Sequence, residues 1–258
     1  MLENKLNAEA WDYEAKRGNF WTRPVNDEDV LSARNGKILV RLTPSRFVKE
    51  SWVKGTKGSK MLLLASAGGQ QSVLFSAYGA DITSIDISKE QIRRDEETLE
   101  KYGLEGRTIV GDMCDLSMFD DSSFDYVFIP HSINFISSLS KLYSEVVRVL
   151  KDGGHFFFGC ANPVLYIFDE KKEMRGKLKV KYTLPFSDEK SRGKKEKERM
   201  IREKDTFESS HTLSSIMSPL FEKGMVLVDF YSDESLNETV DSFIHDSFLA
   251  FNYVKTRL

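Results

Sequence analysis

Residues 61–86, MLLLASAGGQQSVLFSAYGADITSID, constrain the fold of this chain more than any other segment. An apolar run enters a loop of small residues, and an amphipathic stretch then leads to a second apolar run that ends at Asp86. This order predicts a strand, a tight turn, a helix and a second strand. Small residues let backbone N–H groups approach a ligand, and a carboxylate at the second strand end can accept hydrogen bonds from ribose hydroxyls. The segment predicts a site for a nucleoside-containing cofactor; an ordinary tight turn is the alternative.

Length and composition set wide limits. The chain has 258 residues, enough for one large α/β domain or two small ones. It contains no run of about 18 apolar residues, so we expect no membrane-spanning helix, and the polar residues 1–20 lack the apolar core of a signal peptide. Cys114 and Cys160 have no partner at disulfide-framework or metal-binding spacing. We therefore predict no metal site and a cytoplasmic location.

Charge is distributed unevenly along the chain. The net charge is −3, yet residues 171–204 hold 14 Lys and Arg against 6 Asp and Glu, which leaves −11 on the rest. A solvated surface insertion is the favoured interpretation. A basic segment that attracts an anionic substrate or surface is the alternative.

Apolar runs alternate with helical patterns over residues 60–162, which indicates βαβ units. Strands are expected at 61–65, 81–85, 107–110, 124–129, 154–159 and 225–231. Residues 247–256 alternate apolar and polar side chains, which is typical of a half-buried antiparallel strand at a sheet edge. The predicted fold is α/β, a Rossmann-like three-layer sandwich whose sheet is seven-stranded and mostly parallel, with an antiparallel last strand.

Capping signals locate the predicted helices. Ser88 precedes a helix that ends near Tyr102 and Gly103, and further helices are expected at 26–34, 139–150 (ended by Gly153 and Gly154) and 214–222. Residues 1–59 are interpreted as an irregular N-terminal arm or lid, and 60–258 as the main domain. That domain carries a charged insertion at about 163–205, whose second half, 187–205, is expected to be poorly ordered.

A second carboxylate follows another predicted strand. Asp112 comes directly after the strand at 107–110, with Met113 beside it. Carboxyl ends of parallel strands meet at one edge of the sheet, where open α/β sheets bind ligands. Asp112 is therefore expected to hold an adenine amino group, and Met113 to contact the ring.

Taken together, these motifs resemble those of class I S-adenosylmethionine-dependent methyltransferases, and more narrowly a bacterial subgroup without an agreed substrate. The resemblance rests on LLLASAGGQQ, ITSIDIS, GDMCDLSMFDDSSFDYVF and EVVRVLKDGGHFFFG. The subgroup adds GNFWTRPV and LTP before the domain, and NPVLYIFD, SHTL and VDFYSD after it. The match covers nearly the whole chain and is poorest over 171–205.

The resemblance implies S-adenosylmethionine as cofactor and assigns its contacts. A loop around its methionine part is implied for Ala65, Ser66, Ala67, Gly68, Gly69 and Gln70. Asp86 would bind the ribose hydroxyls and Ile87 would lie against the adenine, while Asp112 and Met113 would meet the adenine edge. Pro130, His131 and Ser132 would lie beside the sulfonium and the methyl-accepting atom.

The first motif departs from the family pattern. Where glycines are usual, this loop has Ala65 and Ala67, and Leu63 replaces a common acidic residue. The methyl group of alanine restricts positive φ, so the loop must adopt permitted dihedrals or lie farther from the ligand. A degenerate, non-catalytic member of the fold is therefore an open alternative.

A general base is required only if the acceptor loses a proton when it is methylated. His131 is the candidate, since a neutral imidazole can accept a proton near pH 7; a purely structural role is the favoured alternative. Trp11 and Trp21 form either an aromatic lid or a clasp that holds the arm to the domain. Asn162, after the fifth strand, is a candidate for the acceptor pocket.

The leading functional prediction is methyl transfer to a small-molecule acceptor. An NAD-dependent oxidoreductase would more usually show G-x-G-x-x-G where this chain has A-S-A-G-G-Q. A nucleic-acid methyltransferase would need phosphate contacts from the basic insertion, but few aromatic side chains interleave its most charged half. A protein that binds S-adenosylmethionine without turnover is the third alternative. The sequence makes no prediction of the oligomeric state.

Overall fold

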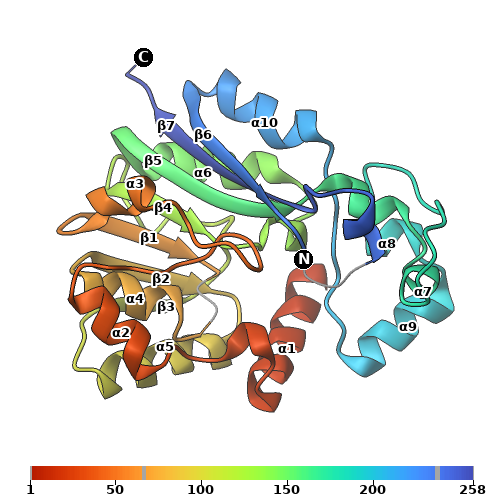
Figure 1. Ribbon diagram of the computed structural model, residues 1–258, viewed down its shortest axis with the longest axis horizontal. Coiled ribbons are helices and arrows are strands. Elements are labelled where there is room, and N and C mark those ends of the chain that lie inside the picture. Colours follow the sequence, from red (N-terminus) through yellow and green to blue (C-terminus); the bar gives the residue numbers. More distant parts are fainter. Residues whose placement is uncertain (1, 66–67, 236–238, 258) are drawn as a thin grey trace.

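Seven strands form one sheet in the order β3-β2-β1-β4-β5-β7-β6 (Figure 1). The computed structural model describes residues 2–65, 68–235 and 239–257. The strands are β1 (Lys60–Leu64), β2 (Asp81–Asp86), β3 (Arg107–Val110), β4 (Phe124–Ile129), β5 (Leu150–Ala161), β6 (Met225–Asp233) and β7 (Phe248–Lys255). β1 to β5 pair in parallel, and β7 is antiparallel to both β5 and β6. The predicted α/β class and mostly parallel sheet are confirmed.

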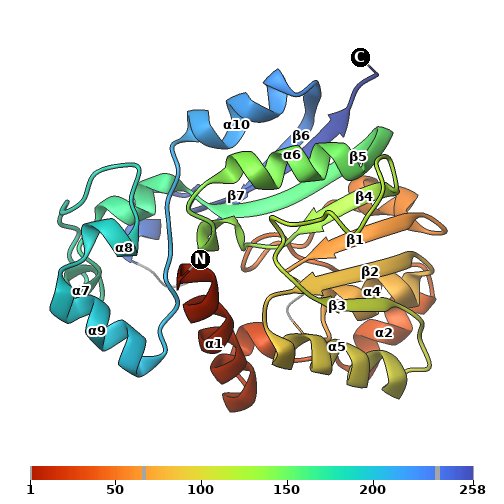
Figure 2. The same ribbon diagram turned by 180° about the vertical axis from the view of Figure 1, so that it is seen from behind.

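Helices cover both faces of this sheet, which gives the predicted three layers. One face carries α2 (Asp27–Arg34), α3 (Glu50–Val53), α4 (Gln71–Tyr78) and α5 (Lys89–Lys101), and the other carries α6 (Leu139–Val149) and α10 (Leu213–Glu222) (Figure 2). Met61 and Leu63 of β1 belong to the hydrophobic core on the face covered by α2 to α5. Leu62 and Leu64 belong to the core on the face covered by α6 and α10. A central strand buried on both faces is apolar throughout.

The last strand does not lie at the edge of the sheet, so that prediction is wrong. β7 lies between β5 and β6, and Leu249 and Ala250 enter the cores on opposite faces. The polar residue Asn252 is buried and its Oδ1 lies 2.9 Å from Nδ1 of His155. Because a buried polar side chain can have a partner within the sheet, the sequence of a fully buried strand can show the same apolar and polar alternation as a half-exposed one.

Two predicted helix starts are confirmed. The Asn26 side chain accepts a hydrogen bond from the Asp29 N–H, and Ser88 Oγ accepts one from the Gln91 N–H. The predicted end of the 139–150 helix is wrong in detail, because the chain turns directly from Val149 into β5. Gly153 and Gly154 therefore lie inside that strand.

Residues 1–59 are not irregular, because they begin with α1 (Leu2–Arg17), a helix of 16 residues. Its buried face includes Asn7, Ala10 and Ala15. These small or polar residues produce no apolar stripe, so periodicity alone does not reveal the helix.

The expectation that 187–205 is poorly ordered is also wrong. This stretch forms α8 (Asp188–Ser191) and α9 (Lys194–Glu203), which follow α7 (Glu170–Glu173). Met200 packs inward, and Arg199 pairs with Glu203 at 2.7 Å. Figures 1 and 2 show α7, α8 and α9 as a lobe beyond the carboxyl ends of the strands, with α1 between this lobe and α5.

Candidate functional site

A cavity of about 1370 Å³ opens at the carboxyl edge of the sheet. Four neighbouring parallel strands lead into it, at Ala65 after β1, Asp86 at the end of β2, Asp112 after β3 and Pro130 after β4. α1 and the insertion supply further lining residues. The volume exceeds the roughly 300–1,000 Å³ of a typical single small-molecule pocket. The cavity can therefore hold a nucleoside cofactor and a second ligand beside it.

The loop after β1 uses left-handed backbone conformations at three described positions. Ala65 has φ +54°, Gly68 +63° and Gly69 +81°. A Cβ on Gly69 would lie 2.5 Å from Thr98 Oγ1, so only glycine fits there. Ala65 and Gln70 line the cavity, whereas Gly68 and Gly69 do not. Ser66 and Ala67 fall outside the described residues.

Asp95 organises this loop, and the sequence prediction missed it. The side chain, on α5, is fully buried and accepts hydrogen bonds from the Gly69 N–H, from Ser72 Oγ at 2.7 Å and from Ser84 Oγ at 2.9 Å. One carboxylate thereby joins the loop, the start of α4 and strand β2. The available signal is an aspartate at an inward-facing position of an amphipathic helix.

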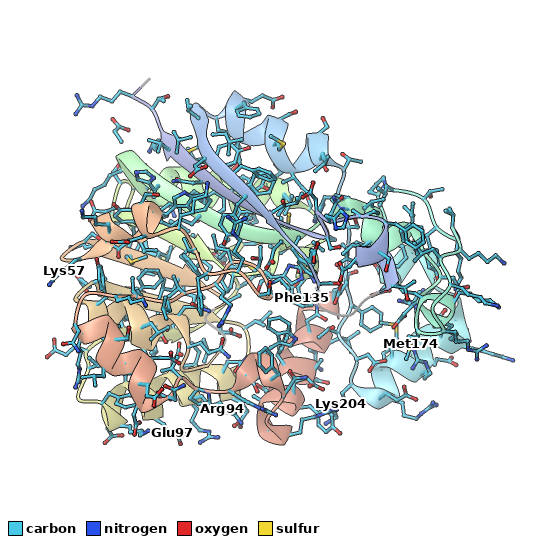
Figure 3. The ribbon with its side chains drawn as sticks, in the orientation of Figure 1. Lys57, Arg94, Glu97, Phe135, Met174 and Lys204 are labelled. Atoms are coloured by element: carbon cyan, nitrogen blue, oxygen red, sulfur yellow. The ribbon has the colours of Figure 1, made fainter. Side chains whose placement is uncertain are left out.

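Gln70 faces the N-terminal arm as well as the cavity. Its Nε2 donates to the backbone oxygens of Trp21 at 3.1 Å and Arg23 at 2.9 Å. Arg94, which extends from α5 toward α1 in Figure 3, donates to the backbone oxygens of Ala15 and Thr22. The first motif and the arm are therefore one hydrogen-bonded unit.

The two predicted carboxylates meet at the cavity, together with the apolar residues beside them. Asp86 is 7% exposed and accepts a hydrogen bond from the Ser88 N–H at 2.9 Å. Asp112 accepts from the Cys114 N–H at 2.8 Å and from Asn4 Nδ2 at 2.7 Å. Each carboxylate oxygen offers two lone pairs, so the two bonds to Asp112 leave capacity for a ligand there. Ile87 and Met113 line the same region.

Helix α1 bridges the two sides of the cavity. Asp12 Oδ1 accepts hydrogen bonds from Ser88 Oγ at 2.6 Å and from the Glu90 N–H at 3.1 Å, so it caps the start of α5. On the other side, Asn7 exchanges two hydrogen bonds with the backbone of Phe207, at 3.0 and 2.7 Å. The sequence prediction missed all of these contacts because the partners are far apart in the chain.

Pro130, His131 and Ser132 line the cavity beyond β4. The His131 ring packs edge-on against Phe248, with 4.8 Å between ring centroids, and its Nδ1 has no hydrogen-bond partner among the described residues. Burial lowers the pKa of His131 to about 4. The imidazole is therefore neutral near pH 7, and it is a weaker base than an ordinary histidine.

The two predicted tryptophans line the cavity, but the predicted acceptor residue Asn162 does not. Trp11 lines the cavity and meets Phe135 edge-on at 5.4 Å between centroids; Figure 3 shows Phe135 close to α1. Trp21 also lines it but remains 45% exposed. Asn162 does not line the cavity, because its side chain accepts from the Val164 N–H and donates to the Asp246 backbone oxygen.

Two motifs of the resemblance turn out to contact each other. Asp233, in VDFYSD at the end of β6, accepts hydrogen bonds from Ser45 Oγ and from the N–H groups of Ser45 and Arg46, directly after LTP. Gly159 of β5 lies against the backbone of Leu42, whose oxygen would lie 1.8 Å from an added Cβ. These motifs hold the arm to the sheet.

Within residues 2–65, 68–235 and 239–257, no group of three His, Cys, Asp or Glu side chains is arranged to hold a metal ion. The helices of that same part of the chain are all too short or too polar to cross a bilayer.

The fold and its edge site belong to a known class of enzyme. A methyltransferase domain matches residues 62–158, and a relative matches nearly the full chain. The protein belongs to the class I S-adenosylmethionine-dependent methyltransferases, and S-adenosylmethionine is its cofactor. That relative is the uncharacterized methyltransferase YbaJ of Bacillus subtilis (strain 168), which is 35% identical over 239 residues, 93% of each chain.

Solved structures show the same fold. An S-adenosylmethionine-dependent methyltransferase of Mesorhizobium loti aligns with a TM-score of 0.60 and 15% identity, covering 77% of this chain and 92% of that one. The 1,6-didemethyltoxoflavin-N1-methyltransferase of Burkholderia thailandensis, solved with 1,6-didemethyltoxoflavin and S-adenosylhomocysteine, aligns with a TM-score of 0.58 and 11% identity, covering 98% and 88%.

Proposed function

We propose that this enzyme methylates a small-molecule acceptor, bound between the loop after β4 and the insertion. The observation that carries the proposal is the large cavity at the strand ends, with α1 and the insertion lobe around it. Such a cavity suits a compact ligand held beside the cofactor. The Burkholderia neighbour, whose acceptor is a small molecule, has the same fold.

The described lining residues fit the cofactor. We assign the methionine part to the loop at Ala65 and Gln70, the ribose hydroxyls to Asp86, and the adenine to Ile87, Asp112 and Met113. Asp86 and Asp112 are acceptors at two strand ends, as ribose hydroxyls and an adenine amino group require. Gly68 and Gly69 support the loop from outside the cavity, and roles for Ser66 and Ala67 remain predictions of the sequence.

The catalytic task of the protein is alignment and exclusion of water. The bound sulfonium supplies an already activated methyl group. Pro130, His131 and Ser132 would orient the acceptor for in-line attack, and the aromatic pair Trp11 and Phe135 would keep water out. His131 is assigned a positioning role, since its low pKa makes it a poor base.

Helix α1 is proposed to act as a lid. It touches the cofactor half of the cavity through Asn4 and Asp12 and the insertion half through Asn7. These contacts are hydrogen bonds rather than apolar packing, and segments held in this way open more readily than the core. Limited proteolysis of the arm with and without S-adenosylhomocysteine tests this role; equal cleavage rates would contradict it.

A nucleic-acid acceptor is the alternative, and its phosphate contacts would have to come from the basic insertion. Three cations of the insertion already have acidic partners: Lys194 pairs with Glu198, Arg199 with Glu203, and Arg192 with three acidic side chains. Binding of RNA or DNA that weakens steeply with salt would revive that alternative. A cytoplasmic location remains a prediction of the sequence.

Calorimetry with S-adenosylhomocysteine and NAD tests the cofactor assignment, and Asp86→Asn should weaken binding of the former about tenfold. Release of S-adenosylhomocysteine from S-adenosylmethionine in the presence of a small-metabolite extract tests turnover. Tight binding without turnover would instead favour a non-catalytic binding protein.

A further inference from the structure

A polar cluster lies where the insertion meets the loop after β4. The Ser209 N–H donates to the backbone oxygen of Asn134 at 2.7 Å, which fixes Glu208 beside that loop. Asn134 lies two positions after Ser132, and both Asn134 and Glu208 line the cavity. The proposed cofactor residues are at the other strand ends, so this cluster faces the acceptor half.

Glu208 is a carboxylate held in a defined orientation. Tyr166 donates its hydroxyl to Oε2 at 2.6 Å, and the Asn134 side chain lies beside the same carboxylate. Burial and the nearby charges of Asp188 and Glu170 raise the pKa of Glu208 above its ordinary value. Arg192 is committed to Asp188 and Glu170. A carboxylate with a raised pKa is a better base than an ordinary glutamate.

Asn134 supplies a second, independent sign of a ligand. Its side chain is 4% exposed, and Oδ1 has no hydrogen-bond partner among the described residues. The Asn134 side chain must point its NH₂ group toward the Glu208 carboxylate, because a carboxylate accepts hydrogen bonds. Its amide oxygen is then left as an acceptor without a donor. Buried acceptors without partners are rare, and a ligand that donates a proton would satisfy this one.

The surrounding walls are aromatic. Tyr166 and Tyr182 pack on Phe186 with 5.7 and 4.9 Å between centroids, and all three line the cavity. Phe135, adjacent to Asn134, adds a further ring. Flat apolar walls beside hydrogen-bond acceptors suit a planar ligand that carries a donor group.

We infer that Asn134 and Glu208 bind the methyl-accepting group, that this group is a hydroxyl or amino group on an aromatic body, and that Glu208 takes its proton. The inference rests on the proposed small-molecule function. As the heteroatom forms its bond to the methyl carbon, the carbon–sulfur bond breaks and its electron pair stays on sulfur. The O–H or N–H proton passes to the Glu208 carboxylate, so charge balances.

Binding of matched probes tests the subsite without a known acceptor. With S-adenosylhomocysteine present, and at a pH low enough for the phenol to keep its proton, para-nitrophenol and para-nitroaniline are titrated beside para-nitroanisole and N,N-dimethyl-para-nitroaniline, which lack the donor. We expect at least one protic probe to bind about tenfold tighter than its blocked counterpart, and Glu208→Gln to remove the difference. Equal binding of a probe pair by the wild type, or no binding of either protic probe, overturns the inference.

Controls separate this subsite from the cofactor site. Glu203→Gln makes the same change on α9, where the side chain is 44% exposed and paired with Arg199, and should leave probe binding unchanged. Binding of S-adenosylhomocysteine should be the same in Glu208→Gln as in the wild type. If the wild type does not bind S-adenosylhomocysteine, the proposed function is refuted instead. If only the Glu208→Gln variant fails to bind it, the variant has a folding defect.

Proton transfer has its own readout if Glu208→Gln folds poorly. Tyr166→Phe removes a hydrogen bond that favours the ionised form, so it should raise the pKa of Glu208. The pH profile of S-adenosylhomocysteine release with the tighter protic probe should then shift to higher pH, because the base must be ionised. An unshifted profile, or no turnover of a bound protic probe, overturns the assignment of Glu208 as the base.

Discussion

Replacing Asp95 by asparagine should destabilise the protein and weaken cofactor binding together. The substitution keeps the shape of the side chain and removes its charge. In the structure this carboxylate accepts hydrogen bonds from the Gly69 N–H, Ser72 Oγ and Ser84 Oγ. The amide oxygen can retain some of these bonds, but its NH₂ group cannot accept any.

The magnitude follows from those three bonds. Hydrogen bonds to a charged acceptor contribute about 1.5–3 kcal/mol each, against about 1 kcal/mol for neutral pairs. Loss of about 0.5–2 kcal/mol on each of three bonds should lower the free energy of unfolding by about 1.5–6 kcal/mol. Asp95→Ala would leave three buried donors unpaired at about 1–3 kcal/mol each, a large part of the roughly 5–15 kcal/mol that stabilises a typical protein.

Denaturant unfolding measures the first effect, and calorimetry with S-adenosylhomocysteine measures the second, for which we expect about tenfold weaker binding. Glu97→Gln is the matched control, since Glu97 lies on the same helix with its side chain 58% exposed. It should change stability by less than about 0.5 kcal/mol. An Asp95→Asn protein as stable as this control, with unchanged cofactor affinity, would refute the assigned role.

Three further predictions concern the loop, the arm and the cavity. Ala65→Gly should raise the free energy of unfolding in denaturant by about 0.5–1 kcal/mol, because it relieves the positive φ; a decrease would contradict this. Asp233→Ala should lower the free energy of unfolding by about 2 kcal/mol and speed proteolysis of the arm, since Ser45 and Arg46 lose their acceptor. Unchanged cleavage would contradict the role of Asp233 in holding the arm to the sheet. His131 protonates near pH 6.5 in the unfolded chain but only near 4 in the folded one. Wild-type stability should therefore fall by about 3 kcal/mol more than that of His131→Asn between pH 7 and 4, and parallel pH profiles would show an ordinary pKa.

Local patterns were sufficient to predict the centre of the fold. The strand, turn, helix and strand of residues 60–86, the cap at Ser88 and the alternation of later strands depend on neighbours in sequence. Parallel strands bring their carboxyl ends to one edge whatever their exact order. The sequence therefore predicts that Asp86 and Asp112 share one site, and both line the cavity in the structure.

Position within the sheet was harder to predict. Burial depends on what covers a strand, and Asn252 looked solvent-facing because its partner, His155, lies almost a hundred residues away in the chain. The sequence did not predict helix α1, because the side chains on its inward face are small or polar and form no apolar stripe. Asn162 was predicted to be a pocket residue, but its amide oxygen accepts from the Val164 N–H and its NH₂ group donates to the backbone oxygen of Asp246, which is distant in the chain.

The sequence by itself determined the class of fold, the sheet edge at which the cofactor is expected and the carboxylates expected there, because periodicity, caps and turns act over a few residues. Tertiary structure alone decided which side chains support that edge. Asp95 holds the first loop, Asp233 holds the arm, and Glu208 meets Asn134 only because the insertion folds back over the strand ends. Contacts between distant segments depend on packing, which no local pattern records.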